Sequence, residues 1–180
     1  MTLHNSSPDL FQAHDPLIGA ERLRLYGLDA QACANIQRHQ PFVMSLLPEV
    51  LEQFYARITD FEETRRFFRD ETHIAYMKAA QTRHWQRLTD GRFDDDYART
   101  VMKIGETHFN VGVPPKLYIA FYNVMLLELA NLIALRYASA FPDAGADDQF
   151  ALMKDLTRVL MYDMECAITV YVERSNSIFI

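Results

Sequence analysis

Histidines are the residues of this chain most able to bind a metal ion or to transfer a proton near neutral pH. His4 and His14 lie in a polar N-terminal segment and His39 lies at a predicted helix break, so we expect all three on the solvated surface. His73 and His84 are 11 residues apart on one predicted helix, so they cannot bind the same ion. We expect His84 to be partly exposed near the end of that helix.

His108 is the histidine with the strongest case for chemistry. Val101, Ile104 and His108 recur at helical spacing, so the imidazole leaves its helix on the apolar side. A single histidine on such a face is more often a hydrogen-bonded core residue than a metal ligand. The segment Asn110-Val-Gly-Val-Pro-Pro, however, ends this helix sharply and begins a rigid apolar one. One axial histidine in a helical, aromatic-rich pocket is a common way to bind haem iron.

The rest of the sequence excludes several classes of protein. The patterns GxGxxG, GxxxxGK[ST], GxSxG and HExxH are absent. Cys33 and Cys166 lie in apolar helical contexts away from any histidine, and we interpret both as small buried side chains. The formal net charge of -6 argues against a nucleic-acid partner. The first residues lack the basic start and apolar run of a signal peptide, so we expect a cytoplasmic protein.

The elements that must position His108 are predicted to be helices. No proline lies between Pro48 and Pro114, and no alternating strand pattern persists for more than about four residues. The predicted N-caps are Asp29, Thr72 and Asp94. We therefore predict an all-α fold of six or seven helices, over residues 20–26, 29–41, 41–58, 72–88, 94–112, 115–140 and 147–173.

Domain organisation follows from the same patterns. Residues 1–18 show no periodicity and are predicted to be a flexible arm in front of a single domain over residues 19–180. Only four of the 21 residues from Leu117 to Tyr137 are polar, but two charges and two amides are costly in a bilayer, so we expect a buried helix without membrane insertion. This helix and the run from Val159 to Val172 are apolar beyond one face. We therefore predict that both pair with their copies in a homodimer, with Leu160 and Ile168 in the interface.

A longer motif surrounds His108. The stretch KIGETHFNVGVPPKLYIAFYN, from Lys103 to Asn123, resembles the proximal signature of globin-coupled sensor domains, with Leu117 where the family often has tryptophan. Upstream, Leu51-Glu-Gln-Phe-Tyr matches the second helix of that family. The residues that match its middle segment are Lys78, Gln81, His84, Trp85, Gly91-Arg-Phe and Tyr97. The resemblance covers about residues 25–172. It implies a globin-like helical fold around one haem b, with dimerising C-terminal helices.

The resemblance also implies roles for individual residues. His108 corresponds to the proximal iron ligand, and Tyr55, 53 residues earlier, to the distal tyrosine that donates a hydrogen bond to bound oxygen. Met77 and Ala80 occupy the other distal positions and supply no second hydroxyl, while Tyr118 would contact the proximal histidine and pass on the ligand state. The candidate cofactor-binding residues are Phe54, Tyr55, Phe68, Met77, Ala80, Gln81 and Tyr118.

The residues alone leave two interpretations of Tyr55 open. Leu51, Tyr55 and Ile58 form one apolar stripe, so the phenol points inward. It is either a core tyrosine bonded to a backbone carbonyl or a donor in a haem pocket. In the second case its hydroxyl would stabilise bound oxygen by roughly 1–2 kcal/mol, and carbon monoxide by less.

The function implied is a haem-based sensor of the aerotaxis type, not an enzyme. It would bind O2, with CO and NO as further ligands, and would signal through its dimer interface to an output module, which would follow residue 180 if the chain is part of a longer protein. Two alternatives stay open. One is a haem-free helical dimerisation or docking domain in which His108 is merely packed. The other is a haem enzyme acting on nitric oxide or peroxide, which would want a distal histidine–arginine pair that is not evident.

Overall fold

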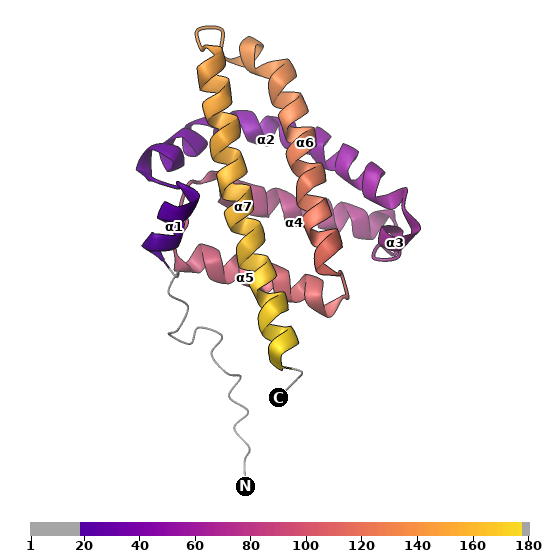
Figure 1. Cartoon of the computed structure of the whole chain (residues 1–180). Coiled ribbons are helices and arrows are strands. Elements are labelled where there is room, and N and C mark those ends of the chain that lie inside the picture. The colour runs from indigo at the N-terminus through magenta and orange to yellow at the C-terminus, as the bar shows by residue number, and fades with distance from the viewer. Residues whose placement is uncertain (1–18, 178–180) are drawn as a thin grey trace.

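The computed structural model of the chain describes residues 19–177, which form helices and no strands (Figure 1). The all-α prediction is therefore confirmed, while the arm predicted over residues 1–18 lies outside the described part. The helices are α1 (Ala20–Tyr26), α2 (Ala30–Thr59), α3 (Glu62–Arg65), α4 (Glu71–Thr89), α5 (Asp95–Asn110), α6 (Pro115–Ala140) and α7 (Ala146–Ser177).

The helices are arranged in two layers. Figure 1 shows α6 and α7 side by side, with α2, α4 and α5 crossing behind them one below another. α5 packs against α7 and α2 packs against α6, while α2 and α4 also contact each other. The core therefore lies between the α6–α7 pair and the three crossing helices.

Three long helices begin at an aspartate. The Asp29, Asp70 and Asp94 carboxylates accept hydrogen bonds from the backbone N–H groups of Ala32 (2.9 Å), His73 (2.8 Å) and Tyr97 (2.9 Å). These caps satisfy backbone donors and place a negative charge at the positive end of the helix. Asp29 and Asp94 confirm the prediction. Thr72 was wrong, because Asp70 starts the helix and Thr72 falls within its first turn.

Helix α2 is continuous through Pro41 and Pro48, where the sequence predicted a break at Pro41. The two prolines are seven residues apart, about two helical turns, so they share one face, and both are exposed. The carbonyl groups left without a partner lie on that outer face, where water can reach them. The opposite face buries Val43, Leu47 and Val50, and this packing maintains the helix.

The uninterrupted helix also explains why the surface prediction for His39 was wrong. His39 follows Ile36 by three residues and precedes Val43 by four, so all three lie on the buried face. Its Nδ1 lies 2.8 Å from the Asn35 carbonyl oxygen and its Nε2 lies 3.1 Å from the Tyr137 hydroxyl. Burial lowers the pKa of His39, so the imidazole is neutral at pH 7.

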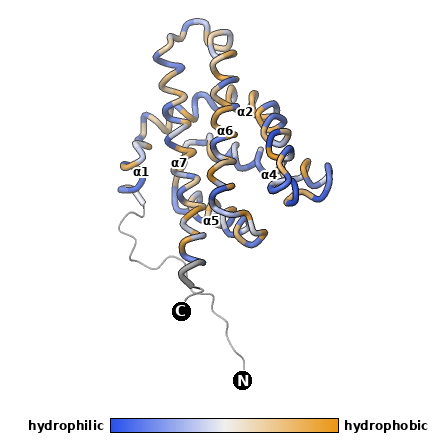
Figure 2. Tube along the Cα trace, turned by 45° about the vertical axis from the view of Figure 1, so that its right-hand side comes forward, coloured by the Kyte–Doolittle hydropathy of each residue, from blue (hydrophilic) through white to orange (hydrophobic). Residues whose placement is uncertain are grey.

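Helix α6 is only partly buried, although the sequence predicted a buried helix. Met125, Leu129 and Ile133 pack into the core, but Leu127 and Leu135 are 47% and 76% exposed. Figure 2 shows hydrophobic residues along the whole helix. Within residues 19–177, α6 is also the helix long and apolar enough to cross a membrane by length and composition, a test that the core helix of a soluble protein passes equally.

Candidate functional site: a cavity lined by His108

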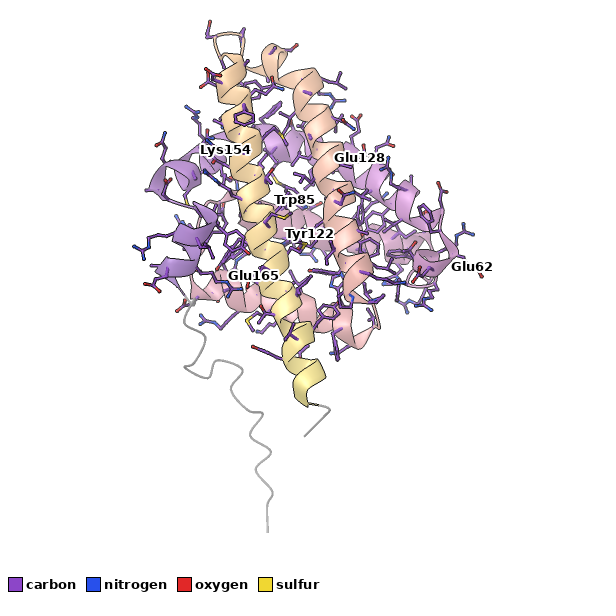
Figure 3. The ribbon with its side chains drawn as sticks, in the orientation of Figure 1. Glu62, Trp85, Tyr122, Glu128, Lys154 and Glu165 are labelled. Atoms are coloured by element: carbon purple, nitrogen blue, oxygen red, sulfur yellow. The ribbon has the colours of Figure 1, made fainter. Side chains whose placement is uncertain are left out.

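A cavity of about 280 Å³ lies between α4 and α5 and is also lined by side chains of α2, α6 and α7. Its walls are mostly apolar and include Phe54, Leu88, Ile104, Phe121, Met125 and Leu160. This volume is near the lower end of the range for small-molecule sites, roughly 300–1,000 Å³. Figure 3 shows Trp85 and Tyr122, two further wall residues, near the middle of the molecule, whereas Glu62 lies at its periphery.

A larger pocket, of about 530 Å³, lies on the surface between the start of α2 and the first half of α7. Its wall mixes three carboxylates with three cationic side chains, namely Asp29, Asp148, Asp155, Arg38, Lys154 and Arg158. Asp155 and Arg158 already form an ion pair at 2.8 Å. Because these charges balance and no histidine or cysteine lines the pocket, we place the functional site in the smaller cavity.

The last turn of α5 holds His108 in the cavity wall with a fixed tautomer. Its Nδ1 lies 2.8 Å from the Ile104 carbonyl oxygen and donates a hydrogen bond to it. The lone pair therefore lies on Nε2. Burial lowers the pKa of His108, so the side chain is neutral at pH 7. A neutral imidazole with one nitrogen bonded and the other free is the form that binds a metal ion.

Close contact between α5 and α7 fixes the position of that last turn. A Cβ atom at Gly105 would lie 2.5 Å from the Ala167 carbonyl oxygen, so no side chain fits there. Gly105 belongs to the Ile-Gly pair that precedes the histidine in the sequence motif. The glycine thus lets α5 approach α7 one turn before His108.

A tight turn then brings the start of α6 against the histidine. The Val113 N–H donates to the His108 carbonyl oxygen at 3.0 Å, and Gly112 adopts a left-handed conformation with φ of 80°. Pro115 begins α6 directly afterwards. The Tyr118 ring consequently meets the His108 ring edge to face, with 4.9 Å between centroids.

Six of the eight candidate residues line this cavity: Phe54, Met77, Ala80, Gln81, His108 and Tyr118. Tyr55 and Phe68 lie beside it without lining it. The Tyr55 ring packs against Phe54 at 5.1 Å and against Phe68 at 5.6 Å, and the Lys78 ammonium lies 5.7 Å from its centroid. Burial raises the pKa of Tyr55, so its hydroxyl keeps the proton.

Sequence reasoning missed a buried polar network on the other side of the cavity. Asp163 on α7 is 1% exposed and accepts hydrogen bonds from the hydroxyls of Tyr97 and Tyr122 and from His84 Nε2 at 3.1 Å. The three donors come from α5, α6 and α4. The one signal in the sequence was an aspartate that interrupts the apolar run from Val159 to Val172.

His84 and Asp163 form an ion pair at the cavity wall. Burial alone would lower the pKa of His84, but the Asp163 carboxylate outweighs it and the pKa is raised. Burial would likewise raise the pKa of Asp163, yet its partners bring it below the usual value. The sequence expectation of a partly exposed His84 is confirmed, because 17% of the side chain is exposed, although Nδ1 is closed to solvent.

Helices that cross around an apolar cavity, with His108 entering it from the last turn of α5, define a globin-like protein. The model of the Protoglobin family matches residues 19–177, and the chain therefore belongs to this family. It is 26% identical over 160 residues to the heme-based aerotactic transducer HemAT of Halobacterium salinarum. That match covers 86% of this chain and 32% of HemAT, so the chain spans about a third of the length of that relative.

Solved structures show the same fold. The globin domain of a Geobacter sulfurreducens globin-coupled sensor aligns with a TM-score of 0.74 at 18% identity, over 84% of this chain and 95% of that domain. The ferric globin domain of E. coli DosC aligns with a TM-score of 0.68 at 17% identity, over 84% of this chain and 99% of that domain. The resemblance to sensor globins and the globin-like fold that it implied are thus confirmed.

Proposed function

We propose that this chain is a haem-based oxygen-sensing domain in which His108 binds the iron. The observation that carries the proposal is the state of His108 in an apolar cavity: Nδ1 bonded to Ile104, a depressed pKa and an Nε2 lone pair available to a metal ion. The similarity to HemAT, whose name describes a heme-based aerotactic transducer, supports the gas-sensing role.

The cavity residues fit a tetrapyrrole. Phe54, Phe121 and Met125 offer apolar and aromatic surface, and Tyr118 holds the proximal imidazole in place. The sequence has no Cys-x-x-Cys-His motif for covalent attachment, which favours non-covalent haem b. Haem supplies an iron that binds diatomic gases reversibly, and the protein controls its affinity through the axial ligand and the polarity of the pocket.

The distal side of the proposed site rests on Tyr55, Met77 and Ala80. Met77 and Ala80 line the cavity, whereas Tyr55 does not line it and packs against Phe54, which does. No described backbone carbonyl accepts a hydrogen bond from the Tyr55 hydroxyl, so this donor is free to serve a ligand. We assign to Tyr55 the hydrogen bond to bound oxygen. CO, which would accept a weaker hydrogen bond from Tyr55, and NO are alternative ligands of the iron.

Signalling would pass through a homodimer built on α6 and α7. The exposed apolar side chains Leu127 and Leu135 on α6 and Phe150 on α7 support such an interface. Tyr118 belongs to the same helix as the first two, so displacement of His108 reaches α6 directly. We propose that the domain acts in the cytoplasm as a transducer for an output module and has no enzymatic role of its own.

Haem and oxygen titrations of the purified chain test this function. We expect one haem per chain, a five-coordinate ferrous spectrum and a stable, reversible change in that spectrum on exposure to oxygen. A chain that retains no added haem would instead be the haem-free docking domain. Rapid turnover of nitric oxide or peroxide, without a stable oxygen adduct, would make it a haem enzyme.

A further inference from the structure

Two buried polar atoms on the cavity wall have no hydrogen-bond partner among the residues that the structure describes. They are Nδ1 of His84 and Oε1 of Gln81, and both residues line the cavity. Gln81 and His84 are three residues apart on α4, so they share one face of that helix. Buried polar atoms without partners are rare in native proteins because each has given up its bonds to water. The pair therefore indicates a missing ligand.

The surroundings of His84 fix the direction of its free nitrogen. Nε2 lies 3.1 Å from Asp163 Oδ2, and that carboxylate is in turn bonded by Tyr122 (2.5 Å) and Tyr97. The Tyr97 ring also stacks on the imidazole, with 6.3 Å between centroids. Since three helices hold the Asp163–His84 contact, the ring cannot turn Nδ1 toward another partner without breaking it.

The charge of this group defines the chemistry of its ligand. The Asp163 carboxylate raises the pKa of His84 and so favours the protonated imidazole, in which Nδ1 carries a proton and shares a positive charge. Such a donor forms its strongest hydrogen bonds with negatively charged acceptors. Arg87, one turn further along α4, is a cation near His84 that lowers the pKa of the imidazole. The opposite effect of the Asp163 carboxylate is larger, so the pKa of His84 is raised overall.

We propose that His84 Nδ1 is the binding site, inside this cavity, for an anionic hydrogen-bond acceptor, and that Asp163 is the positioning residue for it. The inference rests on the proposed haem-binding function. The acceptor is either a carboxylate of the tetrapyrrole or a small anion bound at the iron, which share the same chemistry. Gln81, one turn earlier, can contact the same anion only through its amide NH2 group, because Oε1 is itself an acceptor.

A single substitution separates this role from the structural ion pair. In His84→Gln the amide nitrogen replaces Nε2 and can still donate to Asp163, whereas the donor at the Nδ1 position is lost. His73→Gln is the matched control, because His73 lies on the same helix without lining the cavity. Equal thermal stability of the two haem-free variants would confirm that the fold tolerates the change.

The probes are haem, its dimethyl ester and azide. If the acceptor is a tetrapyrrole carboxylate, haem leaves His84→Gln about tenfold faster than wild type, and the ester leaves both proteins at the same rate. If it is an anion at the iron, haem retention is unchanged and the azide dissociation constant of the ferric protein rises about tenfold. Identical haem release and identical azide affinity in wild type and His84→Gln would overturn the proposal. Wild-type protein that binds no haem would refute the proposed function itself, and this inference with it.

Asp163→Asn tests the positioning role through its pH profile. The amide keeps the shape of the carboxylate but not its charge, so burial and Arg87 would leave His84 neutral at pH 8. At pH 8 we expect Asp163→Asn to show the same faster haem release or weaker azide binding as His84→Gln. Below about pH 6, where an isolated histidine takes up a proton, we expect this variant to regain wild-type haem release and azide binding. In wild type the Asp163 carboxylate raises the pKa of His84, so the loss of binding should begin at a higher pH than in Asp163→Asn. A variant loss that does not depend on pH would mean that Asp163 acts through packing alone.

Discussion

The rings of His108 and Tyr118 meet edge to face across the α5–α6 turn, with 4.9 Å between their centroids. The Tyr118 hydroxyl lies 3.4 Å from the Tyr122 hydroxyl, which donates to Asp163 on α7. A displacement of His108 therefore has a short route to both helices of the α6–α7 pair. The same contacts also extend from Asp163 to His84, on the opposite wall of the cavity.

The role of Tyr55 predicts a difference between two gases. Tyr55→Phe removes one hydroxyl and keeps the ring contacts with Phe54 and Phe68. We expect oxygen to dissociate about tenfold faster, equivalent to about 1.4 kcal/mol, because bound oxygen carries partial negative charge. Carbon monoxide dissociation, measured by the same stopped-flow method, should change much less. Equal changes for both gases would show that Tyr55 acts by shape.

The contact between Gly105 and Ala167 predicts a large loss of stability on a small substitution. In Gly105→Ala the new methyl group would lie 2.5 Å from a backbone oxygen, so α5 must move away from α7. We expect a loss of about 1–3 kcal/mol in the free energy of unfolding of the haem-free chain, measured with urea. Gly145→Ala is the control, because its nearest neighbour lies 3.9 Å away. A Gly105→Ala variant as stable as this control would contradict the packing.

The exposed apolar residues of α6 predict where a homodimer can be broken. Leu160, expected in the interface from the sequence, is instead buried within the chain and lines the cavity, so it is unsuitable for this purpose. Leu127→Glu and Leu135→Glu place a charge on exposed positions and should give monomers that still bind haem. Leu25→Glu, on α1, is the exposed control. Sedimentation that shows wild type to be monomeric at micromolar concentration would remove the proposed signalling route.

The buried histidine of α2 predicts a dependence of stability on pH. The pKa of His39 is lowered in the folded chain, so below about pH 6.5 the unfolded chain takes up a proton there that the folded chain does not. The contribution of neutral His39 to the free energy of unfolding is therefore full above about pH 6.5 and is lost as the pH falls. We expect the free energy of unfolding to decline less steeply between pH 7 and pH 5 in His39→Gln than in wild type. Parallel curves would mean that His39 titrates normally in the folded state.

Most helix boundaries around the cavity were predictable from local sequence signals. Asp29 and Asp94 mark helix starts by a mechanism confined to one turn, and the Gly-Val-Pro-Pro segment ends one helix and begins the next. His108 was identified because its apolar face and this turn are both readable in the sequence. Local patterns were thus enough to find one wall of the cavity.

The other features depend on contacts between distant segments. Pro41 lies inside α2 because the opposite face of that helix is buried by α6 and α7, which no local rule reveals. His39 became a core residue for the same reason. Asp163 finds its three donors on three other helices, between 41 and 79 residues away in the chain. Only the assembled fold shows that this carboxylate is satisfied and that His84 Nδ1 is not.

The most direct test of the account is to remove the His108 side chain and supply it again in solution. His108→Gly should lose haem, or bind it with an altered ferrous spectrum, and added imidazole should restore the five-coordinate spectrum of wild type by occupying the vacated space. His73→Gly should behave as wild type throughout. A His108→Gly protein that shows the wild-type ferrous spectrum without imidazole would contradict the assignment of His108 as the iron ligand.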